Sequence, residues 1–149
     1  MKKIIFTWAI ILTAGLTSAF AAPDGGINQG TIASFKKEFV SASNVSWQTE
    51  SVYAKATFTI NDQVMFAYYS MDNNELMAVA RNISSRQLPL HLFTGLKKEC
   101  NGYWITGIFE VAKPDETSYY ATLENSDETI VLEAIGATEW HVYKKTKKS

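Results

Sequence analysis

The residues best suited to nucleophilic catalysis are Cys100, the only cysteine, and His91, one of two histidines. A thiol and an imidazole hydrolyse esters or amides when the two side chains lie within hydrogen-bonding distance. The apolar spacing around them predicts one helix that contains both, nine residues apart. Nine residues are two and a half turns, so the side chains point to opposite sides, about 13 Å apart along the axis. The sequence therefore predicts no catalytic pair here.

No combination of side chains predicts a metal or cofactor site. The histidines and the cysteine lack partners at the spacing of zinc ligands. Residues 72–75, Asp-Asn-Asn-Glu, offer oxygen ligands for calcium, but the closing glutamate of a calcium-binding loop is missing. Asn and Asp also favour tight turns, which is the simpler interpretation. We expect no cofactor and no metal ligand.

The candidates for acid–base catalysis are three glutamates on predicted strands, Glu110, Glu124 and Glu133. Two carboxylates on one sheet face could serve as the acid and the base of a glycosidase. Solvated strand faces explain these residues equally well, and the sequence singles out no pair. We therefore expect a protein that is not an enzyme, and an exported hydrolase with acidic catalytic residues stays as an alternative.

Residues 1–21 have the features of a cleaved secretory signal peptide. Lys2 and Lys3 form the positive start, residues 4–16 are apolar, and Ala19-Phe20-Ala21 supplies the small–x–small pattern that a signal peptidase accepts. The apolar run is shorter than the roughly 20 residues that a membrane span needs. We expect cleavage after Ala21, a periplasmic or secreted location, and no membrane span after cleavage.

Charge and cysteine content limit the partners and the source of stability. The 149-residue sequence has a formal charge of −1, and loss of Lys2 and Lys3 lowers it to −3. An acidic protein of this kind is not expected to bind nucleic acid. The lysines within residues 144–149 are expected to form a solvated, frayed terminus. A single cysteine permits no disulfide within the chain, so the fold must depend on its hydrophobic core.

Hydrophobic periodicity predicts a flexible leader at 22–30, then helix, four strands, helix, four strands. The first helix, about 31–42, has Thr31 as its cap. Pro89 suits the first turn of the second helix, whose buried stripe ends near Cys100. Alternating apolar and polar residues predict the strands. These begin at Val45 and continue through 51–60, a hairpin at 64–80, 103–112, 118–125, 128–135 and 139–144.

The two halves of this pattern are similar to each other. FKKEF at 35–39 matches LKKEC at 96–100, and ATF at 56–58 matches ATL at 121–123, after which the strands keep an offset of 65 residues. The order of elements repeats as well. The sequence therefore predicts one α+β domain at 31–149, made of pseudo-repeats 31–84 and 85–144, with both helices on one face of an antiparallel sheet.

The hairpin at 64–80 is apolar on both faces, although an antiparallel sheet with one solvated side should alternate. Transfer of the second repeat's alternation predicts which residues face the helices: Met65, Ala67, Tyr69, Leu76, Ala78 and Ala80. The opposite, helix-free face and its polar rim are then expected to contain Tyr53, Lys55, Val64, Phe66, Tyr68, Met77, Val79 and Arg81. Tyr and Met are enriched in protein interfaces, and an apolar patch of this kind marks a binding surface.

We therefore expect this face to bind a protein or peptide, or a second copy of the chain in a homodimer. A small apolar or glycan-derived ligand on the same face is the alternative.

The sequence also resembles the beta-lactamase-inhibitor-like, PepSY-like family of small exported proteins common in Bacteroidetes. The resemblance spans about residues 34–143 and is carried by Val45-x-Trp47, Leu88-Pro89 and Gly102-Tyr103-x-Ile105. It implies two tandem helix-plus-four-strand units in a periplasmic or secreted, non-catalytic protein. Restraint of a hydrolase is one form of binding that it implies.

Export can be tested at the N-terminus. We expect secreted protein to begin at Ala22, because residues 1–21 combine all three parts of a signal peptide. N-terminal sequencing measures this directly, and exported material that begins at Met1 would contradict the prediction.

Overall fold

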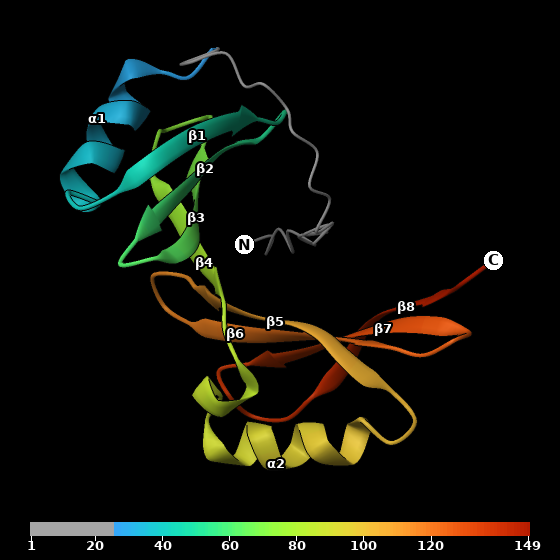
Figure 1. Ribbon diagram of the computed structural model, residues 1–149. Helices are drawn as coiled ribbons and strands as arrows, with labels where there is room; N and C mark the ends of the chain where they lie inside the picture. The colour runs from blue at the N-terminus through green and yellow to red at the C-terminus, as the bar shows by residue number, and fades with distance from the viewer. Residues whose placement is uncertain (1–25) are drawn as a thin grey trace, which may run out of the picture.

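The computed structural model describes residues 26–149, so the predicted signal peptide (1–21) and residues 22–25 of the leader lie outside the described residues. Two helices and eight strands follow one another in the order that the sequence predicts (Figure 1). The first unit contains α1 (Gln29–Glu38), β1 (Ser43–Thr49), β2 (Tyr53–Ile60), β3 (Gln63–Ser70) and β4 (Leu76–Asn82). A short 3₁₀ turn, Ser85–Gln87, leads to α2 (Leu90–Glu99), β5 (Trp104–Ala112), β6 (Thr117–Glu124), β7 (Glu128–Ile135) and β8 (His141–Lys147).

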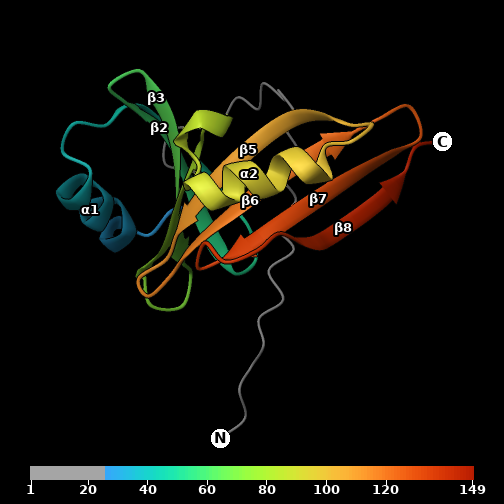
Figure 2. The same ribbon diagram turned by 90° about the horizontal axis from the view of Figure 1, so that it is seen from below.

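All eight strands form one antiparallel sheet in sequence order, β1 to β8. This confirms the α+β class and the two helix-plus-four-strand units. The sheet bends where β4 meets β5, and the helices cover the outer side of the bend, α1 over β1–β4 and α2 over β5–β8 (Figures 1 and 2). The inner side of the bend is the helix-free face.

Helix α1 begins and ends earlier than the sequence predicts. Asn28, not Thr31, is its cap, and the Asn28 side chain accepts a hydrogen bond of 2.7 Å from the backbone N–H of Gly30. Thr31 is buried in the first turn, where its hydroxyl donates to Asn74 in the β3–β4 turn at 2.9 Å. The helix ends at Glu38, where Phe39 leaves helical geometry. Part of the predicted leader is therefore helical.

The core of the first unit lies between α1 and the sheet. Phe35 contacts Phe58 edge-on at 5.0 Å between ring centroids and contacts Trp47 at 5.3 Å. Ala56 and Ala67 are fully buried beneath these rings, since small side chains leave room for aromatic ones. Strand alternation thus creates a continuous apolar layer on the helix side.

The core of the second unit is built in the same way under α2. Leu92 and Leu96 are each 1% exposed and pack against β5, β6 and β7. The indole N–H of Trp140 donates to the carbonyl of Leu92 at 2.8 Å, and this tryptophan lies against Gly95. The 65-residue offset holds in three dimensions, because Phe58 and Leu123 are equally buried in the two cores.

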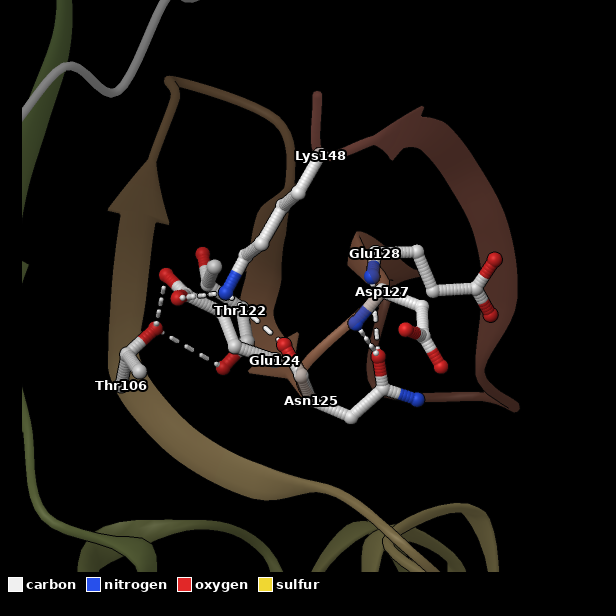
Figure 3. A network of polar contacts seen from close by, with 7 residues as sticks. All are labelled: Thr106, Thr122, Glu124, Asn125, Asp127, Glu128 and Lys148. Atoms are coloured by element: carbon white, nitrogen blue, oxygen red, sulfur yellow. Dashed lines mark hydrogen bonds and ion pairs between the residues drawn. The ribbon is translucent and has the colours of Figure 1, made fainter.

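The sequence predicts a frayed, lysine-rich C-terminus, but the structure shows that this segment is ordered. Strand β8 continues to Lys147, and Lys145 forms an ion pair of 2.9 Å with Glu128. The Lys148 ammonium lies 3.0 Å from Glu124 and donates to the Asn125 carbonyl at 2.8 Å (Figure 3). Acidic side chains around the β6–β7 turn therefore fix the tail to the sheet.

Two leucines of α2 test this description of the core. Leu92→Ala is expected to lower the free energy of unfolding by about 3 kcal/mol, because it removes buried methyl groups and leaves a cavity. Leu90, on the same helix, is 79% exposed, and Leu90→Ala should change stability by less than about 0.5 kcal/mol. Urea denaturation measures both, and equal effects would contradict the assignment of the buried face.

Candidate partner-binding face

The register of β2 and β3 decides which hairpin residues face away from the helices. Directly paired residues of antiparallel strands share one face. Ala67 pairs with Ala56 and Met65 pairs with Phe58, and all of these residues pack toward α1. The alternate residues Phe66 and Tyr68 therefore lie on the helix-free face, as predicted. Val64 lies on the same face, and so does Lys55 of β2, which pairs with Tyr68.

The predicted sides of the β4 residues that follow Met77 are wrong. Tyr69 pairs with Leu76, but Tyr68 pairs with Ala78, so Met77 is an extra residue in a β-bulge. A bulge reverses the side of every residue that follows it. Ala78 and Ala80, expected to face the helices, pack with Tyr68 on the helix-free face. Val79 and Arg81 pair with Ala67 and Met65 and so lie on the helix side.

Arg81 has a structural partner on that side. Its Nε donates to Glu110 at 2.8 Å, across the β4–β5 pair that joins the two units. The other two glutamates have different partners, since Glu124 binds Lys148 and Glu133 accepts from Tyr120 at 2.5 Å. Each of these three carboxylates therefore has its own partner within the chain.

Side chains from the second unit, which the sequence did not single out, extend the helix-free patch across the sheet. The ring centroid of Phe109 in β5 lies 6.3 Å from that of Phe66. The ring centroid of Tyr120 in β6 lies 5.7 Å from that of Tyr143 in β8. We call the whole set the aromatic face: Tyr53, Phe66, Tyr68, Met77, Phe109, Tyr120, Val131 and Tyr143, around the small residues Ala78, Ala80 and Val111.

The offset of 65 residues would have found part of this set, because it relates Phe66 to Val131. Phe109 was missed because it follows a register shift in β5, between Ile105 and Gly107. Tyr143 was missed because it is itself the extra residue of an irregularity in β8.

The centre of the aromatic face is buried and its periphery is half-buried. Tyr68 and Tyr120 are 8% and 6% exposed, whereas Phe66, Phe109 and Val131 are intermediate. Burial is the main cause that raises the pKa of Tyr68 to about 12, and Tyr53 adds to the rise. Burial and the hydrogen bond to Glu133 raise the pKa of Tyr120 further. Both phenols are therefore neutral at physiological pH.

The candidate nucleophile and base do not meet. The His91 ring donates from Nε2 to the carbonyl of Ala137, whereas Cys100 caps the other end of α2 and packs against the core. Burial, with a smaller effect of Glu99, raises the pKa of the Cys100 thiol and so disfavours the reactive thiolate. Within residues 26–149, no three His, Cys, Asp or Glu side chains lie close enough to hold a metal ion.

The Asn-rich turn after β3 has a structural role. Asn74 adopts a positive φ of 60° and accepts the hydrogen bond from Thr31, and Asn73 donates to Glu75 at 2.8 Å. These contacts use the turn's polar groups to hold the hairpin against α1.

None of the helices in the described part of the chain is long and apolar enough to cross a membrane.

No protein-family model and no curated protein matches this sequence. Solved structures from Bacteroides nevertheless share its fold. A protein of Bacteroides eggerthii, described as a candidate periplasmic protein, has a TM-score of 0.73 at 14% identity, over 83% of this chain and 90% of that chain. A BLIP-like protein of Bacteroides fragilis has a TM-score of 0.67 at 15% identity, over 80% and 85% of the two chains. A DUF2874 family protein of Bacteroides uniformis has a TM-score of 0.71 at 12% identity, over 81% and 89%.

These likenesses define the class of fold. The chain has the fold of the BLIP-like and DUF2874 proteins of Bacteroides, which confirms the resemblance seen in the sequence at the level of structure. At identities of 12 to 15%, these comparisons show a shared fold and do not indicate a partner.

The raised pKa of Tyr68 predicts alkaline sensitivity. The folded state favours the neutral phenol, so its contribution is complete below pH 10.0 and is lost as pH rises toward about 12. Tyr68→Phe has no proton to lose there, and its free energy of unfolding should fall less steeply over this range. Urea denaturation at several alkaline pH values measures the slopes, and parallel slopes for both proteins would contradict the assignment.

Proposed function

We propose that this chain is an exported, non-catalytic binding module that engages an extracytoplasmic protein or peptide through the aromatic face. The observation that carries the proposal is the continuity of this face across both units, from Tyr53 in β2 to Tyr143 in β8. The signal-like residues 1–21 and the periplasmic description of the Bacteroides eggerthii neighbour support export.

The composition of the aromatic face supports a protein partner. Aromatic side chains and methionine dominate interface centres, where a few rigid anchors supply most of the binding energy. The Tyr53 and Tyr68 rings stack edge-on at 5.5 Å, and Phe66 contacts the next unit through Phe109. These contacts fix the rings before a partner arrives, so little side-chain freedom is lost on binding.

The partner that we favour is a hydrolase outside the cytoplasm, whose activity the module restrains. The BLIP-like description of the Bacteroides fragilis neighbour supports this choice. On this proposal the chain acts by covering a surface of its partner, and its own side chains take part in no reaction.

One aromatic residue tests the proposal against a control on the other face. Mature protein is immobilised, periplasmic proteins are passed over it, and the affinity of each retained protein is then measured for the parent and two variants. Phe66→Ser should weaken the binding of a true partner roughly thirtyfold, the effect of losing one aromatic anchor. Leu90→Ser, which changes an exposed apolar residue on α2, should leave the affinity unchanged.

The same variants identify the other occupants of this face. Partners that bind Phe66→Ser as tightly as the parent protein would contradict the proposal. A dimer of the parent that becomes monomeric in Phe66→Ser, seen by analytical ultracentrifugation, would assign the face to a second copy instead. Urea denaturation of Phe66→Ser checks that the domain remains folded.

A further inference from the structure

Lys55 is a cation set among the rings of the aromatic face. It is the third residue of β2, directly opposite Gln48 of β1 and Tyr68 of β3. Its ammonium lies over the ring of Phe66, 4.7 Å from the centroid. A cation over an aromatic ring is stabilised by the ring's negative face, but such a contact leaves its charge unneutralised.

The second unit has a charged residue at the related pair of positions, and that residue has a hydrogen-bond partner within the chain. The offset of 65 residues relates Lys55 to Tyr120 and Tyr68 to Glu133. Each unit therefore has one charged residue and one tyrosine paired across neighbouring strands on the helix-free face. In the second unit, the Tyr120 hydroxyl donates to the Glu133 carboxylate at 2.5 Å. In the first unit the charged residue is a cation, Lys55, and a hydrogen bond to a neutral phenol would leave its charge in place.

Lys55 forms no ion pair in the part of the chain that the structure describes. The ion pairs found there involve Arg81, Lys145 and Lys148. Burial lowers the pKa of Lys55, and the more distant Glu50 only partly opposes this effect. A half-buried, unpaired ammonium gains most when an anion approaches, because the surrounding rings exclude the water that would otherwise solvate it.

We propose that Lys55 is the anchor for a carboxylate of the partner, so that the aromatic face selects protein segments with Asp or Glu beside apolar side chains. This inference rests on the function proposed above and names the chemistry of the partner. The carboxylate would pair with the ammonium while the apolar neighbours of the acid cover Phe66 and Tyr68.

A carboxylate fits the surroundings better than a phosphate group does. Phosphate carries close to two negative charges at neutral pH and is bound by several cationic or fork-shaped donors. Lys55 supplies one point charge, and Arg81, which the sequence placed on the same face, lies on the helix side with Glu110. A single lysine with aromatic neighbours matches a singly charged acid.

Selection from a random peptide library tests the proposal without a known partner. The library is displayed on phage and selected in parallel on the mature protein and on its Lys55→Met and Lys55→Arg variants. Methionine keeps the length of the side chain and removes its charge, whereas arginine keeps the charge. We expect Asp and Glu to be enriched with the parent protein and with Lys55→Arg, and this enrichment to be lost with Lys55→Met.

Synthetic peptides then give the size of the effect. One selected acidic peptide and its counterpart with Gln for Glu and Asn for Asp are titrated by calorimetry. The acidic form should bind the parent roughly tenfold more tightly, as expected for a half-buried charge contact, and should lose this advantage on Lys55→Met. Equal affinities of the two forms, or an acidic preference that persists in Lys55→Met, would overturn the proposal, as would a library from which no peptide is selected.

Phe66→Ser separates this inference from the proposed function. If selected peptides lose affinity for Phe66→Ser but are indifferent to Lys55→Met, the aromatic face binds partners and the carboxylate anchor is wrong. If they bind Phe66→Ser as well as they bind the parent, both proposals are wrong.

Discussion

The short ladder between β4 and β5 is the constraint on which the rest of the molecule depends. Val79–Asn82 pairs with Phe109–Ala112, and this pairing joins two four-stranded units into one sheet. Because paired residues share a face, it also relates the faces of the units to each other. Arg81 and Glu110 meet on the helix side, and Ala80 and Val111 meet on the helix-free side. A slip of one residue would place the helices on opposite faces of the sheet.

The aromatic face follows from this register. Each unit buries its own helix-side core, and neither core includes residues of the aromatic face. The small side chains of Ala78 and Ala80 at the bend allow rings from the two units to approach, as Phe66 and Phe109 do. Stability and recognition are therefore assigned to different sides of the same strands. The period of two in a β-strand makes this separation available, and the bulge at Met77 changes where it falls along β4.

The sequence predicts the parts of this fold that depend on local periodicity. Alternation and the internal repeat place Ala67 and Tyr69 on the helix side and Phe66 and Tyr68 on the opposite face, in agreement with the structure. The sequence fails where one residue changes a register or where distant partners decide. The extra residue at Met77 has no composition signature, since Met, Ala and Val suit either side of a strand. Asn28 and Thr31 are both good caps, and the contact of Thr31 with distant Asn74 decides between them.

The sequence also fails to predict which lysines form ion pairs, as the C-terminal lysines and Lys55 show. Both involve lysines, but the sequence alone does not tell which cations find carboxylates in the folded chain. Lys145 and Lys148 are brought to Glu128 and Glu124 because β8 pairs with β7 beside the acidic β6–β7 turn. Lys55 lies within β2, between two other strands, where its paired neighbours are Gln48 and Tyr68 and neither carries a negative charge. Sheet register therefore neutralises the terminal cations and leaves the central one among aromatic rings. A charge in that position is the kind that a partner, more than the chain itself, can satisfy.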